Sequence, residues 1–237
     1  MPSSSLLDAK RICVTLEQLC LRIEDRFPDA GLLRTARALL DLARETDRIT
    51  DWIERPHWPL RVFSYSLIVL LLGLLFYTIG QFRIELDTYG FKGLVELSES
   101  VVNELILLGA AVLFIVTSET RRKRRRVINS VNRLRALAHV IDAHQLTKDP
   151  DSIGQRARPT QHSPKRTLTA HELSRYLDYC SELLSLIGKV AFLYVQRFDD
   201  AVAVTAVNEL EDLTTSLSRK IWQKIVILRQ MESSDGA

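Results

Sequence analysis

Cysteine, glycine and proline are all scarce in this sequence, whose 237 residues include 3 Cys, 9 Gly and 7 Pro. So few glycines and prolines favour helices over a sheet-rich fold. The cysteines are odd in number and lie on predicted cytoplasmic helices, where thiols stay reduced. Cys13 and Cys20 are seven residues apart on one predicted helix face, so we expect both to pack against neighbouring helices.

Catalytic motifs are missing as well. The sequence has no Gly-rich phosphate loop, no Gly-x-Ser-x-Gly and no Cys-x-x-Cys. His171-Glu172 begins like a zinc-protease motif, but Arg175 stands where the second His ligand would be. His139 and His144 are five residues apart and point in different directions on a helix. We therefore expect no enzymatic activity, no cofactor, no metal site and no small-molecule substrate.

Two apolar runs stand out against this background. The first lies within 61–82 and carries no charged residue between Arg61 and Arg83. A helix rises about 1.5 Å per residue, so about twenty residues cover roughly 30 Å, the hydrocarbon thickness of a bilayer. Tyr65 and Tyr77 lie toward the two ends of the run, as is typical of residues that prefer the headgroup region. We predict a transmembrane helix over 61–82.

The second run, 101–118, is the weaker of the two. Its uninterrupted apolar core is Leu105–Val116, and Asn103 and Glu104 precede it. A carboxylate at the bilayer centre costs about 3 kcal/mol, but Glu104 is near the end of the run, where it can reach headgroups and water. We predict a second transmembrane helix over 101–118.

A short extracytoplasmic loop, 83–100, joins the two predicted helices. It is too short to fold as an independent sensor domain. Within the second helix, Gly109-Ala110-Ala111 offers small side chains on which the first helix could pack closely. The two runs and this loop together predict a transmembrane hairpin.

Six consecutive basic residues follow the second run, whereas the loop carries only Arg83 and Lys92. Positive residues stay on the cytoplasmic side, so both chain termini are expected there. Near the membrane each basic residue attracts anionic lipid by about 1 kcal/mol. A nucleic-acid patch is the alternative, but the membrane already explains the run, and the net charge of +3 is too balanced for a dedicated polyanion partner. The predicted lipid and topology anchor consists of Arg121, Arg122, Lys123, Arg124, Arg125 and Arg126.

The remaining sequence has apolar residues at helical spacing. It predicts a cytoplasmic helical hairpin over 1–60, a basic juxtamembrane helix over 119–146, a flexible linker over 147–168, a second cytoplasmic hairpin over 169–231 and a disordered tail over 232–237. Thr169 and Glu172 have the spacing of a capping box. In the juxtamembrane helix the apolar residues alternate four and three apart, which predicts a stalk. The predicted helix-pairing face of the second hairpin consists of Leu173, Leu177, Leu184, Ile187, Leu210, Leu217 and Ile221.

These features predict an all-α integral membrane protein with a two-helix transmembrane hairpin and coiled-coil-like cytoplasmic hairpins. We expect it in the cell membrane, as a multi-pass protein with both termini in the cytoplasm. The expected function is that of a non-enzymatic interaction, scaffold or regulatory protein, which associates with itself as a homo-oligomer or with a protein partner through its cytoplasmic helices. The alternative is a subunit of an oligomeric ion channel or pore-forming effector, with Asn103 and Glu104 lining the path.

Overall fold

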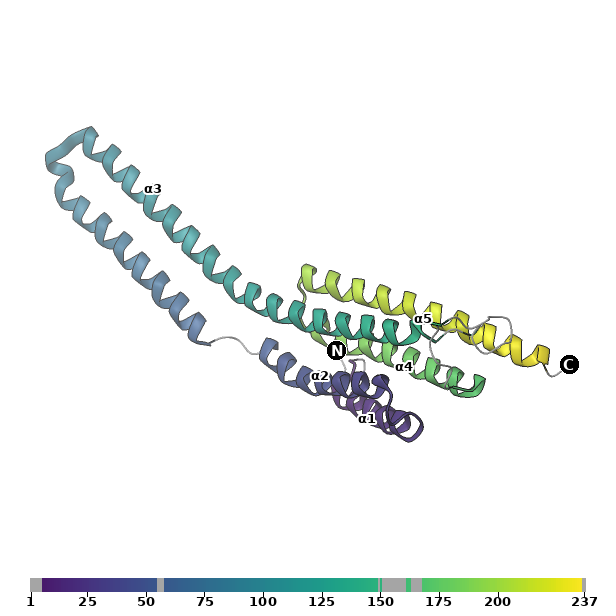
Figure 1. Cartoon of the computed structure of the whole chain (residues 1–237). Helices are drawn as coiled ribbons and strands as arrows, with labels where there is room; N and C mark the ends of the chain where they lie inside the picture. Colours follow the sequence, from purple (N-terminus) through teal and green to yellow (C-terminus); the bar gives the residue numbers. More distant parts are fainter. Residues whose placement is uncertain (1–5, 55–57, 149, 151–160, 163–167, 236–237) are drawn as a thin grey trace. The chain divides into compact units, whose positions relative to one another are not determined.

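The computed structural model describes residues 6–54, 58–148, 150, 161–162 and 168–235. The protein is all-helical, and these residues contain no strand. The helices, shown in Figure 1, are α1 (Ala9–Arg26), α2 (Gly31–Glu54), α3 (Trp58–Leu146), α4 (Ala170–Val195) and α5 (Ala201–Asp235). They form two compact units. One, which we call the bundle, combines Met1–Glu54 with Arg126–Ala237; the other, the arm unit, is Arg55–Arg125.

The bundle has a continuous apolar core, because each of its helices buries one stripe. The N-terminal hairpin of α1 and α2 packs against α4, and α4 packs along α5. In α1 the core residues recur three and four apart, as expected for an amphipathic helix. They are Ile12, Leu16, Leu19, Cys20 and Ile23.

The C-terminal part of α3 belongs to this core, which corrects the prediction of a stalk. The four-and-three spacing predicted a covered seam correctly, but spacing cannot say which helices cover it. The bundle supplies that cover, and Arg133 of α3 pairs with Glu45 of α2 while Arg135 pairs with Glu209 of α5. Every residue of the seam is fully buried: Val127, Val131, Leu134, Ala138 and Ile141.

The predicted capping box at the start of α4 is confirmed. The Thr169 hydroxyl accepts a hydrogen bond from the Glu172 backbone N–H, and the Glu172 carboxylate accepts one from the Thr169 N–H. This reciprocal pair lowers the pKa of Glu172. At the start of α5, Asp200 accepts a hydrogen bond from the Ala203 N–H. α5 continues to Asp235, past residue 231, where the sequence predicted its end.

Two polar contacts tie distant parts of the bundle together. Lys224 of α5 donates hydrogen bonds to the carbonyl oxygens of Gln145 and Lys148. These bonds cap carbonyl groups at the C-terminal end of α3. Deeper in the core, the hydroxyl oxygens of Tyr194 and Thr46 lie 2.9 Å apart, and Ser130 also hydrogen-bonds to Tyr194. Tyr194 thus links α4 to α2 and α3.

Replacing Tyr194 with phenylalanine is expected to lower the free energy of unfolding by about 1–2 kcal/mol. The change removes a buried hydrogen bond while keeping the ring and its packing. Chemical denaturation of the detergent-solubilised protein measures the effect, and Tyr65→Phe, at an exposed tyrosine, is the control. Equal stability of Tyr194→Phe and wild type would show that the hydroxyl contributes nothing.

His144 lies over the start of α2, where a methyl group on Gly31 would overlap its ring. Burial, followed by the charges of Arg34 and Lys148, lowers the pKa of His144. The unfolded chain, in which this pKa is near 6.5, therefore binds the proton more readily than the folded chain does. We expect stability to fall as the pH drops below about 7. The pH dependence of the unfolding midpoint should flatten in His144→Gln but not in His171→Gln, an exposed control.

Three predicted segments fall partly beyond the described part of the chain, and in the predicted N-terminal hairpin the residues concerned are 1–5 and 55–57. Of the predicted linker, residues 149, 151–160 and 163–167 lie outside the described residues, as do residues 236–237 of the predicted tail.

Candidate membrane anchor

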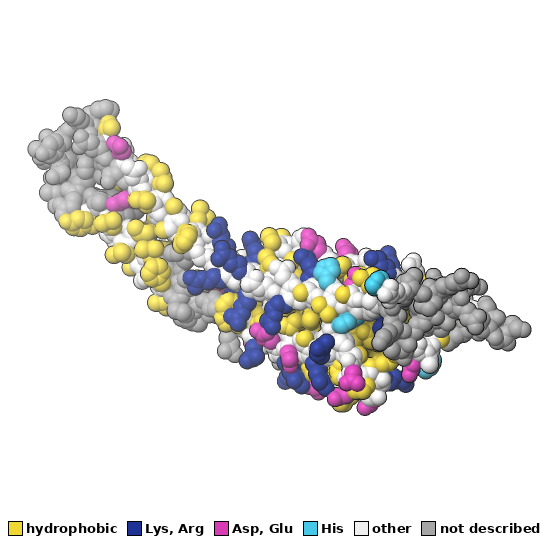
Figure 2. Space-filling model, in the orientation of Figure 1, with side chains coloured by type: hydrophobic (Ala, Val, Ile, Leu, Met, Phe, Trp, Pro, Cys, Tyr) yellow, Lys and Arg dark blue, Asp and Glu magenta, His cyan; other side chains and the backbone are white. Residues whose placement is uncertain are grey.

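The arm unit differs from the bundle in what surrounds its apolar side chains. Every buried hydrophobic residue that the structure describes belongs to the bundle. In the arm unit many of the described large apolar side chains are exposed, and Figure 2 shows hydrophobic side chains gathered over this part of α3. They include Val62, Phe63, Val69, Leu70, Phe76, Val102, Leu105, Ile106, Leu107, Leu113 and Phe114. Exposed apolar patches on this scale mark a surface that is covered by something other than water.

One helical segment among the described residues, Val101–Leu146, is long and apolar enough to cross a membrane, and its most apolar stretch is not buried. This segment contains the predicted second span, 101–118. In the predicted first span, 61–82, the described apolar helix is the shorter Tyr65–Leu74. The sequence had ranked these two runs in the opposite order, whereas the structure supports one candidate span by length and composition.

The predicted loop over 83–100 is helical in its backbone, and Figure 1 shows α3 turning back on itself within the arm unit. The stretch has Gly90 and Gly93 but no proline, so little in it prevents helical backbone. A second correction concerns Gly109. Apart from its chain neighbours and its own helix backbone, no described atom lies within 4 Å of the position a Cβ would take there, so the described residues show no close helix contact at this glycine.

The predicted pore residues lie near the start of the second apolar stretch of α3. Asn103 is exposed and Glu104 is partly buried. Glu99, one turn earlier, is exposed. All three side chains come from one helix of a single chain. A pore would need the same residues from several chains to face one another, so the pore hypothesis stays a prediction.

The six basic residues of the predicted anchor are not equivalent. Lys123 pairs with Glu119 at 3.0 Å, and their side chains are only 13% and 18% exposed. The Arg126 guanidinium lies over the Trp52 ring, 4.7 Å from its centre. Arg124 is partly buried. Arg121, Arg122 and Arg125 are exposed, as is Arg126, and Figure 2 shows dark blue side chains gathered on this part of α3.

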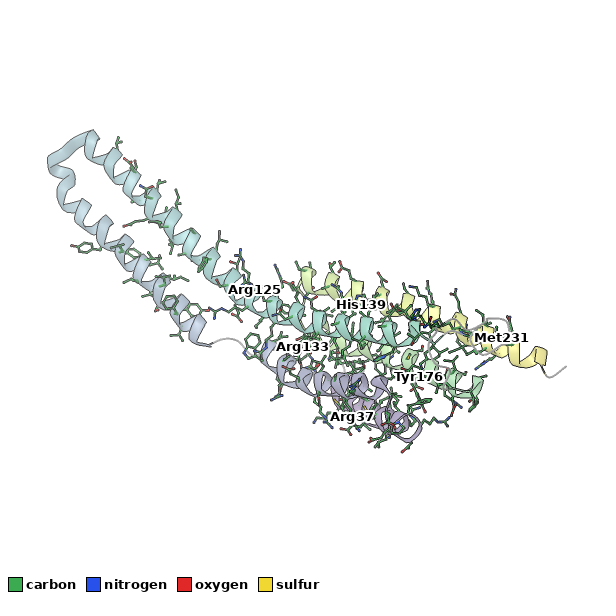
Figure 3. All side chains as sticks on the ribbon, in the orientation of Figure 1. Arg37, Arg125, Arg133, His139, Tyr176 and Met231 are labelled. Carbon is green, nitrogen blue, oxygen red and sulfur yellow. The ribbon has the colours of Figure 1, made fainter. Side chains whose placement is uncertain are left out.

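Sequence reasoning missed the contact between Trp52 and Arg126. Trp52 is half-buried, and the Arg126 guanidinium lies over its ring. The two residues are 74 positions apart in the chain, so no local pattern could have paired them. Figure 3 labels Arg125 and Arg133 on α3 at either side of this point.

The predicted helix-pairing face is used within the chain. All seven of its residues are buried in the bundle core, at the side of α4 and α5 that faces the other helices. The thiols are covered too: burial raises the pKa of Cys180 to about 12 and also raises that of Cys20. Protonated, buried thiols are poor nucleophiles, which agrees with the packing role expected for Cys20.

The substitution Leu107→Arg tests whether lipid covers the exposed apolar side chains of the arm unit. Leu107 is 64% exposed, so in water an arginine there would cost nothing. Near the centre of a membrane span it costs about 3 kcal/mol. We expect the variant to lose much of its carbonate-resistant membrane fraction, whereas Val14→Arg, at an exposed valine of α1, keeps it. Unchanged membrane retention of Leu107→Arg would contradict a lipid-facing position.

Comparisons with protein-family models, with curated proteins and with solved structures give no match to this chain.

Proposed function

We propose that this protein is a membrane-anchored, non-enzymatic interaction protein that presents a helical bundle at the cytoplasmic surface. The observation that carries the proposal is the contrast within one chain: the bundle buries its apolar residues and the arm unit exposes them. Burying apolar surface stabilises by about 25 cal/mol per Å², so an arm unit that leaves its own apolar surface open requires another apolar medium. A bilayer supplies it.

The composition of the bundle supports two membrane crossings. Its helices come from both sides of the arm unit in the chain, residues 1–54 and 126–237. Both flanks must lie on the same side of a membrane for the bundle to form. If the second apolar stretch of α3 crosses, the chain must therefore cross an even number of times, and the first predicted span, 61–82, is the segment available for the return.

The basic residues favour a cytoplasmic bundle. Arg121 to Arg126 lie directly between the candidate span and the bundle, and such clusters are retained on the cytoplasmic side. The buried, unpaired thiols of Cys20 and Cys180 are compatible with that reducing compartment. Both chain termini would then face the cytoplasm.

Because the bundle uses its helix-pairing face internally, a second copy or another protein would have to contact its outer surface. That surface includes exposed apolar side chains, among them Val14 and Leu21 on α1 and Trp222 on α5. Val14 and Leu21 are seven residues apart and so share one side of the helix. Self-association through the cytoplasmic helices remains the form of interaction that we propose.

Crosslinking in native membranes, followed by mass spectrometry, tests the proposal. We expect crosslinks from bundle lysines to a second copy or to one recurrent protein, and their reduction in Val14→Asp/Leu21→Asp. Crosslinks confined to a single chain would refute the interaction role. Cysteine labelling of Thr88→Cys tests the topology separately: labelling only from the cytoplasmic side would overturn two crossings.

The channel hypothesis gives a different result in liposomes. A pore lined by Glu104 would carry cations, and Glu104→Gln would abolish the flux. Under the interaction hypothesis the reconstituted protein carries no flux. Cation flux that disappears with Glu104→Gln would therefore replace our proposal with the channel.

A further inference from the structure

We propose that Arg121, Arg122 and Arg125 together form a binding face for the phosphate groups of anionic lipids, while Lys123 and Arg126 hold the protein's own structure. This inference rests on the membrane insertion proposed above and divides one run of six cations by role. Its first support is that these three arginines are exposed and, unlike Lys123 and the equally exposed Arg126, have no carboxylate or aromatic-ring contact among the described residues.

The three arginines share one side of α3. At about 100° per residue, Arg125 projects roughly 40° from Arg121, and Arg122 roughly 60° from Arg125. Lys123 lies about 200° from Arg121, where its ion pair with Glu119 is mostly covered. The helix thus separates an open cationic side from a neutralised one. Three guanidinium groups within about 100° can contact neighbouring phosphates, and guanidinium is well suited to phosphate because it donates two parallel hydrogen bonds.

The depth along the helix fits the headgroup layer. Arg121 and Arg125 follow Ser118, the end of the apolar run, by three and seven residues, or about 5–10 Å of helix. The polar layer of a bilayer is about 5–8 Å thick on each side. Arg126 comes next, stacks on Trp52, and is followed by Val127, which is fully buried in the bundle.

The apolar side of the helix continues into the arginine face. Leu107, Phe114 and Arg121 are spaced seven residues apart, so they lie along one side of α3, and Leu107 and Phe114 are both strongly exposed. A lipid whose acyl chain contacts Leu107 and Phe114 would have its phosphate beside Arg121. This continuity favours a lipid phosphate over the phosphates of a nucleic acid, which would need no apolar surface next to them.

The test uses the full-length protein in phosphatidylcholine vesicles that contain either spin-labelled phosphatidylglycerol or spin-labelled phosphatidylcholine. The motionally restricted fraction of each label measures how strongly the protein retains that lipid. We expect the wild type to prefer phosphatidylglycerol by roughly fivefold, corresponding to about 1 kcal/mol, and high salt to reduce the preference. Arg121→Gln/Arg122→Gln/Arg125→Gln should bring it to about one.

Two further variants control for charge and folding. Lys10→Gln/Arg219→Gln/Lys220→Gln removes the same charge from exposed positions of the bundle and should keep the preference. Arg121→Lys/Arg122→Lys/Arg125→Lys keeps the charge but loses the parallel hydrogen bonds, so it should keep only part of the preference. An undiminished preference in the first triple variant, or an equal loss in the bundle control, would overturn the lipid face. So would an oligonucleotide that binds the wild type in phosphatidylcholine vesicles and not the triple variant. Absence of restricted lipid with either label would instead refute membrane insertion itself.

Discussion

A chain in which residues 55–125 are replaced by a short Gly/Ser linker is expected to be a soluble, folded helical bundle. The deletion removes the arm unit and leaves every residue of the bundle core in place. The two ends to be joined lie close together, because Arg126 stacks on Trp52, two residues before Glu54. About six linker residues, which reach roughly 20 Å when extended, therefore suffice.

Centrifugation and circular dichroism measure this outcome. We expect the shortened protein in the supernatant without detergent, with a cooperative thermal transition, while the full-length chain stays in the membrane fraction. A matched control deletes the same residues and also carries Arg126→Gln; it should fold with slightly lower stability, because it loses the cation–π contact, of about 1 kcal/mol. A shortened protein that still pellets with membranes would show that the anchor lies in the bundle.

Leu134→Asp is expected to unfold the bundle. Leu134 lies in the C-terminal part of α3 and is fully buried. A carboxylate there has no partner prepared for it, and the cost of burying it adds to the lost apolar contact, for a total of several kcal/mol. This is comparable to the 5–15 kcal/mol that usually separates folded from unfolded domains. The effect should be far larger than that of any surface change.

Limited proteolysis of membranes that contain the variant gives the readout. We expect Leu134→Asp to expose cleavage sites throughout α1, α2, α4 and α5, whereas Ala136→Asp, at an exposed position of the same helix turn, stays resistant. If α3 were a stalk standing apart from the other helices, as its sequence first indicated, both variants would behave alike. Equal protease resistance of the two variants would show that Leu134 faces solvent on a separate stalk.

The comparison of these two positions shows how far sequence periodicity reaches. The spacing of Val127, Leu134 and Ile141 identifies which side of α3 is covered, and the Thr169–Glu172 box identifies where α4 begins, because both are local properties of the chain. Neither pattern identifies a packing partner. The assignment of α3 to the bundle depends on contacts with α2 and α5 from 88 and 74 residues away.

The candidate anchor was predictable in composition but not in detail. A run of six basic residues after an apolar stretch is visible in the sequence, yet its division into paired, stacked and exposed members depends on Glu119 and Trp52. The prediction of a close helix contact at Gly109 has the same limit. A glycine permits such a contact but does not create one. Residue type limits which contacts are possible, and the arrangement of the helices selects among them.

The split origin of the bundle has a consequence for biosynthesis. The ribosome completes α1 and α2 long before α4 and α5 exist, so the apolar side of α2 that finally meets α4 stays uncovered while the intervening residues are translated and inserted. At about 5–20 residues per second, the wait is on the order of ten seconds. During that interval the apolar side of the nascent N-terminal hairpin is open to contact with other apolar surfaces, including the same hairpin on a neighbouring ribosome. Polysomes translating this message are therefore a setting in which two copies can meet before either has finished folding.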